Sequence, residues 1–544
     1  MKSFIPKKLP SIVAGWIRPN WVSFIESASP HMWVLSVIIG VSVGVAAIIF
    51  REAIGFFQLF WLSSSDENTL TSALNVAWYW ILLAPVVGGL IVGQLLQRLN
   101  ARRAGGVADV IEARTNHGRT LDLREGLWSS LISAISLGSG ASAGREGPVV
   151  HLGATLASVV ADNRKLPAWT SKTLLAAGVA SAISASFNAP IAGVLFAHEV
   201  ILQHYAMRSF VPIVIASTAG SVLSRLWFNE SVAFLIPAYQ ITSFWEFPAF
   251  ALLGVVCAIV AIIFQFSLFS ADYVARDIKI PLWLRPVIGG FAIGIMGIFL
   301  PEILGVGYEV TDRMLWNQLP LSLLFILIVA KTAATAITLA SRFGGGIFSP
   351  ALYLGAATGG AFGLIAGSAF PELASSGGLY AILGMGAVAG AVLGAPISTT
   401  MIVFELTGGY ALSIALLLSV AIAHGVNQAV HGHSYFHWQL EMRGLFDHLG
   451  PHRAIMRTKK VMDFFDVLEP GTEPEKMDPK LHTPSLKPTD TIDHALRQFD
   501  AGGHQRLPVV DEIDNTKIIG WATQVKALRT FNDALIDASV EEHR

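Results

Sequence analysis

The stretch GSGASAGREGPVVHLGA, residues Gly138–Ala154, decides how this chain folds. It sets Glu146 among glycines in apolar sequence, two residues before Pro148. Proline suits the first turn of a helix, where the leading backbone N–H groups lack partners and attract negative charge. A carboxylate at membrane depth is energetically costly and marks a functional site by default. We therefore predict that Glu146 lies at an anion-attracting helix end inside a membrane.

The composition around this stretch is that of a polytopic membrane protein. Of 544 residues, 53% are hydrophobic and only 14% are charged, and the mean hydropathy is +0.57. Soluble proteins carry about a quarter charged residues. The net charge of −1 gives no reason to expect a nucleic-acid partner. The partner that the composition predicts is the lipid bilayer, and any preference for anions must come from local dipoles.

The first long apolar run, Trp33–Phe50, can cross the hydrocarbon core of a bilayer. It starts too late for a secretory signal peptide, so residues 1–32 are predicted to be a retained N-terminal tail. Four basic residues place this tail in the cytoplasm by the positive-inside rule: Lys2, Lys7, Lys8 and Arg18. A second run, Leu74–Gln97, is followed by three arginines and returns the chain to the cytoplasm.

Many of the later apolar runs are short or interrupted by glycine and proline. The interruptions fall at 138–148, 188–193, 344–350 and 394–396. Interrupted helices are typical of broken or re-entrant segments that surround a protected polar site. The runs lie at about 127–143, 149–160, 173–203, 209–224, 247–271, 284–300, 318–341, 350–370, 377–404 and 411–430.

The chain also repeats itself. GREGPVVHLGA at 144–154 matches GGGIFSPALYLGA at 344–356, and NAPIAGVLFAHE at 188–199 matches GAPISTTMIVFE at 394–405. Glu199 and Glu405 hold equivalent places in the second pair, which predicts a structural role at helix ends. Two related halves follow, at about 33–227 and 245–440, within a transmembrane domain of 33–440.

Paired halves with interrupted helices form ion sites from helix N-termini that face one another at mid-membrane. Glycine there lets an ion approach the backbone, which a Cβ would obstruct. The candidate anion-binding groups are backbone N–H groups in the two glycine-rich breaks. They belong to Gly144, Arg145, Gly147, Gly345, Gly346, Ile347 and Phe348. The Arg145 side chain is more readily explained as a structural partner of backbone carbonyls than as a pore ligand.

These motifs resemble the CLC family of chloride channels and proton-coupled chloride exchangers. The motifs that carry the resemblance are GREGP, GGGIFSP and the two Ala-Pro-Ile segments, and the similarity runs through about residues 30–440. The resemblance implies an all-α inverted-repeat bundle, a homodimer, and a chloride pathway in each subunit. It also implies that Glu146 is the gating residue, whose carboxylate occupies the anion's place and moves aside on protonation.

The chain departs from the family's pattern at three places. Gly105 stands where a serine hydroxyl would contact the ion, so that contact is missing. Val200 stands where exchangers carry an inner glutamate that feeds protons toward the gate. The pore tyrosine has two candidates, Tyr435 and Phe436, of which only Tyr435 offers a hydroxyl for the anion.

The loss of the inner glutamate favours a passive channel gated by Glu146, with a proton-coupled chloride antiporter as the alternative. His198, two residues before Val200, is a candidate for a proton path, although a histidine on an apolar helix is more often a packing residue. No Walker-type phosphate loop and no defined metal-ligand spacing occur in the sequence. We therefore expect a transport protein and no enzyme, without a metal or other cofactor for transport.

Charge returns after about residue 431, and 455–544 is predicted to be a small α/β cytoplasmic domain. Its segment 489–527 is read as helix, strand, turn, strand, helix. This domain resembles a single CBS module, the regulatory fold that often binds adenine nucleotides in pairs. An adenine nucleotide is therefore a candidate ligand, and a regulatory membrane sensor is a remote alternative function. The location that we expect is the bacterial inner membrane, with both termini cytoplasmic.

Overall fold

The computed structural model describes most of the chain in two compact units, Met1–Leu440 and Glu441–Arg544. The predicted tail 1–32 lies almost entirely outside the described residues. Apart from isolated positions (17, 20–22, 234, 455–456 and 514), the described residues are 29–65, 69–115, 121–228, 239–407, 412–444, 459–468, 484–512 and 517–543.

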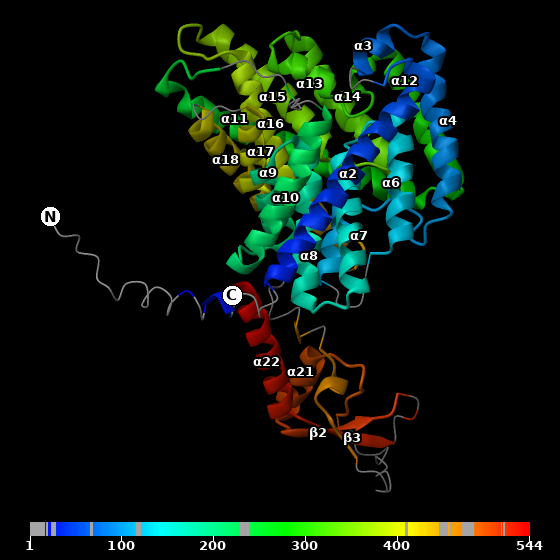
Figure 1. Cartoon of the computed structure of the whole chain (residues 1–544), viewed down its shortest axis with the longest axis vertical. Helices are drawn as coiled ribbons and strands as arrows, with labels where there is room; N and C mark the ends of the chain where they lie inside the picture. The colour runs from blue at the N-terminus through cyan, green and yellow to red at the C-terminus, as the bar shows by residue number, and fades with distance from the viewer. Residues whose placement is uncertain are drawn as a thin grey trace, which may run out of the picture. The chain divides into compact units, whose positions relative to one another are not determined.

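The first unit is an all-helical bundle (Figure 1). The helices of its first half are α2 (Ser29–Leu62), α3 (Thr69–Leu74), α4 (Trp78–Leu96), α5 (Val107–Thr115), α6 (Leu123–Gly138), α7 (Glu146–Asn163), α8 (Ala168–Phe187), α9 (Pro190–Phe196), the π-helix η1 (Ala197–Leu202) and α10 (Met207–Phe228). Those of its second half are η2 (Phe244–Glu246), α11 (Phe247–Asp277), η3 (Leu282–Leu284), α12 (Arg285–Phe299), η4 (Pro301–Ile303), α13 (Tyr308–Leu315), α14 (Leu321–Ala340), α15 (Phe348–Ala369), α16 (Gly377–Leu393), α17 (Pro396–Thr407), α18 (Ser413–His431) and α19 (Tyr435–Glu441).

Eight helices within the described residues are long and apolar enough to cross a membrane. Others are too short to do so, such as α9, which is seven residues long and begins at Pro190. The predicted fold class is therefore confirmed, and the chain is a multi-pass membrane protein. The second predicted run, Leu74–Gln97, is divided, because the Asn75 side chain donates to Thr71 O (2.9 Å) where α3 ends and α4 begins only at Trp78.

The two halves pack in matching ways. The helix pairs α7–α8 and α15–α16 each cross at two glycines. A Cβ on Gly153 would lie 2.6 Å from the carbonyl oxygen of Gly178, and a Cβ on Gly355 would lie 2.3 Å from that of Gly384. Between the halves, α4 packs on α12 and α9 packs on α17. The repeated sequence motifs thus correspond to repeated close helix crossings.

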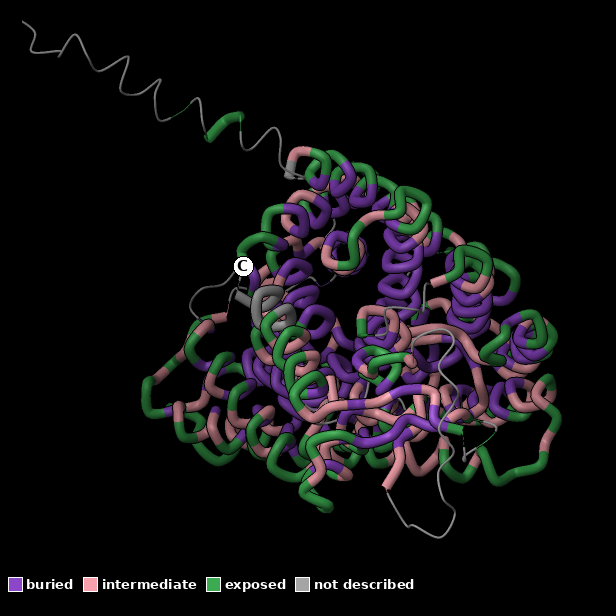
Figure 2. Tube along the Cα trace, turned by 90° about the horizontal axis from the view of Figure 1, so that it is seen from below, coloured by how far each residue is buried: buried purple, intermediate pink, exposed green. Residues whose placement is uncertain are grey.

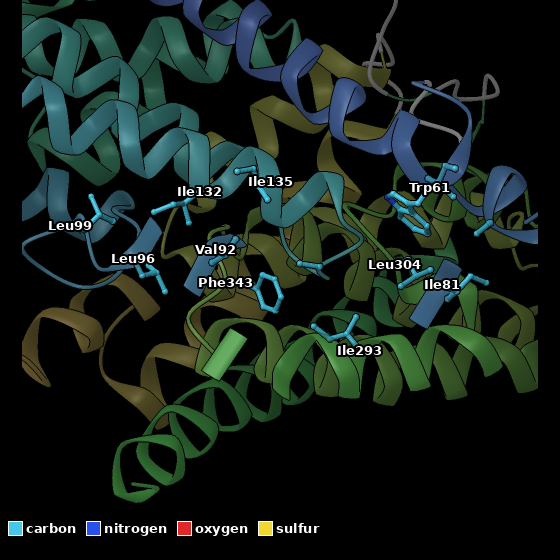
Figure 3. Close-up of a cluster of buried hydrophobic side chains, with 13 residues drawn as sticks. Trp61, Ile81, Val92, Leu96, Leu99, Ile132, Ile135, Ile293, Leu304 and Phe343 are labelled. Carbon is cyan, nitrogen blue, oxygen red and sulfur yellow. The ribbon is translucent and has the colours of Figure 1, made fainter. Parts of the chain in front are cut away.

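A buried apolar core joins the two halves (Figure 3). It draws side chains from α2, α4 and α6 of the first half and from α12 of the second. Its members are Trp61, Leu62, Ala73, Ile81, Val92, Leu96, Leu99, Ile132, Ile135, Ala141, Ile293, Leu304 and Phe343. Exposed residues gather at the periphery of the tube in Figure 2. The exposed residues include large apolar side chains, such as Ile49 and Phe60 of α2 and Phe266 of α11, as expected of helices that face lipid.

The direction of α2 defines the two ends of the bundle. We call the end at which α2 begins, near Ser29, the inner end, and the end at which it finishes, near Leu62, the outer end. The chain then returns through α4 to the inner end (Figure 1). The positive-inside rule assigns the inner end to the cytoplasm.

The second unit is a small α/β domain. Its elements are η6 (Val461–Asp463), β1 (Asp466–Val467), α21 (Ile492–Gly502), β2 (Arg506–Val510), β3 (Ile518–Thr523) and α22 (Gln524–His543). The strands form an antiparallel sheet in the order β1-β3-β2, with Val509 opposite Gly520. The order helix, strand, strand, helix agrees with the prediction for 489–527. A buried cluster that includes Ile492, Phe499 and Leu507 forms its core.

Candidate functional site

The site is centred on Glu146, the first residue of α7, whose side chain is fully buried. The Tyr308 hydroxyl donates to Glu146 Oε1. The Ser349 Oγ lies 2.7 Å from both carboxylate oxygens. Tyr308 and Ser349 occupy the first turns of α13 and α15 in the second half. The carboxylate of one half is thus held by two hydroxyls of the other, as a buried charge requires.

The two glycine-rich breaks meet beside this carboxylate. Gly144 N donates to Gly346 O and Gly346 N donates to Gly144 O, both at 2.7 Å. A Cβ on Gly144 would lie 2.7 Å from Glu146 Oε2, and one on Gly345 would lie 2.4 Å from the Cβ of Ala143. Glycine is needed here because two backbones and a carboxylate approach one another closely. The N–H groups of Gly144 and Gly346 are engaged in this bridge, so an anion could use them only by breaking it.

The other predicted backbone donors lie at the starts of the two helices. Gly147 is the second residue of α7, and a Cβ on it would lie 3.2 Å from the Cα of Gly346. Ile347 is the N-cap of α15 and Phe348 is its first residue. The Phe348 ring packs on Phe187 of α8, with 5.0 Å between ring centroids. The two N-termini thus meet within one buried region, as the repeat predicts.

Arg145 joins this region through its side chain. The guanidinium is buried, lies 4.7 Å over the ring of Tyr308 and donates to Ser186 O at 3.4 Å. Arg145 and Tyr308 also line a cavity of about 310 Å³ at the outer end, together with Arg51, Glu52 and Gln58 of α2. Tyr308 therefore lies between this outer cavity and Glu146.

Two further residues predicted from the sequence, His198 and Tyr435, form their hydrogen bonds with groups other than the Glu146 carboxylate. His198 is buried in η1; its Nδ1 pairs with His204 O at 2.9 Å, and its ring stacks on Tyr205. The ring of Tyr435 packs on Phe269 of α11, and its hydroxyl accepts a hydrogen bond from Gln439 at 3.0 Å.

Gly105 contacts two polar side chains. Its N–H donates to Ser129 Oγ at 2.6 Å, and a Cβ built on it would lie 2.4 Å from His151 Nε2. The volume that a serine side chain would fill at this position is therefore occupied by an imidazole.

Sequence reasoning missed Tyr308 and Ser349, the two donors to Glu146. Ser349 lies inside the GGGIFSP motif, and Tyr308 follows LGVG at 304–307, a further glycine-rich break that could have drawn attention. Gly307 has a φ of +90° as the N-cap of α13, so glycine suits it. The intramembrane Lys331 supports the same loop, donating from Nζ to Ile303 O and Gly305 O, each at 3.0 Å.

Glu199 and Glu405 act as reciprocal helix caps. Glu405 accepts from the N–H groups of Ile191 and Ala192 at the start of α9. Glu199 accepts from those of Ile397 and Ser398 at the start of α17. Each glutamate caps the helix of the opposite half, which confirms the structural role predicted for the pair.

A polytopic bundle in which broken helices from two halves meet around a buried carboxylate is the architecture of a membrane protein that transports ions. Comparison with known proteins agrees. Residues 88–428 match the family model for voltage-gated chloride channels. A putative ClcB-like chloride channel protein of Ralstonia nicotianae is 30% identical over 393 residues, covering 71% of this chain and 91% of that protein. The voltage-gated ClC-type chloride channel ClcB of Escherichia coli is 28% identical, over 75% and 98%.

Solved structures share the fold at low identity. A slow cyanobacterial Cl⁻/H⁺ antiporter superposes with a TM-score of 0.69 at 22% identity, covering 77% of this chain and 99% of that one. A CLC-type fluoride/proton antiporter gives 0.63 at 22% identity, covering 74% and 96%. The chain belongs to the voltage-gated chloride channel family, the CLC family, and is an anion-transport protein of the membrane.

Proposed function

We propose that this protein conducts chloride through a pathway in each subunit and that protonation of Glu146 opens the pathway. The observation that carries the proposal is the buried Glu146 carboxylate, held by Tyr308 and Ser349 where the N-termini of α7 and α15 meet. Helix N-termini and hydroxyl donors stabilise an anion, and the carboxylate occupies the place that a chloride ion would take.

The gating step follows from this competition. The charged carboxylate binds the same donors as chloride and excludes the ion. A proton neutralises the carboxylate, which weakens its charge-assisted hydrogen bonds to Tyr308 and Ser349. Chloride can then displace it. Acid should therefore raise chloride flux.

We favour a passive channel over a coupled antiporter because Val200, buried in η1, has no group that could carry a proton. The antiporter is the second candidate, since two similar solved structures are proton antiporters by name. Both candidates are tested by reconstituting the full chain in vesicles and measuring the reversal potential under a proton gradient. A channel gives the chloride equilibrium potential; a reversal potential that moves with the proton gradient shows antiport. Absence of any anion flux would favour the remote alternative, a regulatory membrane sensor.

We also propose the homodimer that the family resemblance implies, and adenine-nucleotide binding by the second unit. The mass of the detergent-solubilised protein tests the first. A rise in melting temperature of the full chain on addition of ATP tests the second, and no rise at millimolar ATP counts against it.

A further inference from the structure

His151 is a buried histidine on the same helix as the gate. It lies five residues after Glu146 on α7, about 7.5 Å along the helix axis toward the inner end. Its side chain is 6% exposed, and no described residue forms a hydrogen bond with its Nδ1. A buried polar atom without a hydrogen-bond partner costs folding free energy, so its presence calls for an explanation.

Gly105 makes room for this ring. A Cβ at position 105 would lie 2.4 Å from Nε2, 2.5 Å from Cε1 and 2.7 Å from Cδ2, so the Nε2 edge of the imidazole faces Gly105. The backbone donors beside it are already used. Gly105 N donates to Ser129 Oγ and Gly106 N donates to Asp109 Oδ2 (2.9 Å). The imidazole of His151 is thus the titratable group that lies next to Gly105.

A small cavity leads to the ring from the inner end. It has a volume of about 50 Å³ and is lined by Gly105, Ser129 and His151, and by Leu99 beyond the end of α4. This is enough for a few water molecules. Since α4 ends at the inner end, the cavity lies on the opposite side of Glu146 from the large outer cavity.

The charges around this cavity favour a proton over an anion. Three carboxylates and one guanidinium line it: Asp109, Asp122, Glu125 and Arg103. Arg103 is paired with Asp109 through both of its terminal nitrogens. The remaining acidic groups attract hydronium and repel chloride. The cavity therefore suits proton uptake better than anion binding.

We propose that His151 accepts protons from the inner solution and passes them to Glu146. A hydronium ion in the cavity protonates the imidazole and leaves as water. The imidazolium then gives one proton, across bridging water, to the Glu146 carboxylate; the ring returns to neutral and the gate becomes a neutral acid. This inference rests on the proposed gating role of Glu146. It supplies an inner proton route that does not use Val200, so it serves the antiporter candidate as well as a proton-gated channel.

His198 offers a weaker route. Its Nδ1 is committed to His204 O, and its ring lies against Tyr205 and Phe210. His198 Nε2, like His151 Nδ1, has no hydrogen-bond partner among the described residues, so what distinguishes His151 is the cavity at its ring.

The test uses excised inside-out patches from cells that express the full chain, so that the pH at each face can be changed alone. The outer pH is held near 8, and the inner pH is lowered from about 8 to about 5.5 to raise the inner proton concentration. We expect inner acid to activate chloride current in the wild type. We expect the rate of that activation to fall about tenfold or more in His151→Gln. Activation by outer acid should persist in this variant, which also shows that it is folded.

Three further variants sharpen the result. His151→Glu should restore the inner response at lower pH, because a carboxyl group can also carry a proton. His424→Gln should behave as the wild type; it is a matched change at a histidine of α18 whose Nδ1 has no hydrogen-bond partner among the described residues. If His151→Gln responds to inner acid as the wild type does, the inference is wrong. It is also wrong if the response to inner acid is lost in His198→Gln but kept in His151→Gln. Absence of chloride current in the wild type at any pH contradicts the proposed function itself.

Discussion

At the residue scale, Glu146 is a buried carboxylate whose burial is offset by hydrogen bonds from hydroxyl groups. Its carboxylate is fully buried and is held by the hydroxyls of Tyr308 and Ser349. Hydroxyls stabilise the charge while leaving it free to be neutralised by a single proton. Such a group can switch between an anion that blocks a pathway and a neutral acid that does not.

The first residue-scale prediction concerns Glu146→Gln. The neutral amide keeps the shape of the side chain but cannot compete with chloride as an anion. We expect flux near its acid-activated maximum at neutral pH, with little further change between pH 5 and 8. Chloride efflux from vesicles at a clamped potential measures this. A pH dependence equal to that of the wild type would count against Glu146 as the gate.

The second concerns Tyr308→Phe, which removes one donor to the carboxylate. A hydrogen bond to a charged group contributes about 1.5–3 kcal/mol, so the site holds the blocking carboxylate less tightly when this donor is removed. We expect the chloride flux at neutral pH to shift upward by about tenfold or more. Tyr353→Phe is a matched control, because that buried hydroxyl donates to Glu302 O instead. Equal shifts in flux in both variants would contradict the role of Tyr308 as a donor that holds the gate.

At the scale of elements, the short helices α9 and α17 depend on one another. Each begins at the proline of an Ala-Pro-Ile sequence. Glu199, in η1 directly after α9, caps α17, and Glu405, within α17, caps α9. A short helix has too few internal hydrogen bonds to satisfy its leading N–H groups, so an external carboxylate stabilises its start.

We therefore predict that Glu405→Gln destabilises the bundle. The change removes the charge and one of the two acceptors for Ile191 and Ala192, at a cost of about 1–3 kcal/mol. A lower melting temperature in detergent is the expected result, and Glu199→Gln should act in the same way. Glu372→Gln, at an exposed position, is the control and should leave the melting temperature unchanged. A melting temperature of Glu405→Gln equal to that of the control would contradict the capping role.

At the scale of the whole molecule, the residues around Glu146 and the C-terminal α/β domain belong to different compact units. All residues that contact the Glu146 carboxylate belong, among those described, to the first unit, and the second unit has its own buried core. We therefore expect transport itself to depend on the first unit.

Deleting residues from about 455 onward should accordingly spare chloride permeation. Efflux from vesicles that contain the truncated protein should stay within about twofold of the full chain, since no group of the pathway is removed. A truncated protein that elutes as a single folded species but conducts no chloride would show that the second unit is required.

The sequence by itself determined the broken helices and the repeat, because glycine and proline act on the local backbone and are visible in one dimension. It also pointed to Glu146, since a charge in apolar sequence is costly wherever the chain folds. Only the tertiary structure decided which groups hold that charge. Tyr308 and Ser349 lie 162 and 203 residues away, and the glutamate caps join residues about as distant. The ring of His151 likewise fills the space left by Gly105. These pairings arise where one half packs against the other or where distant helices cross, and local sequence carries no record of which side chains such packing brings together.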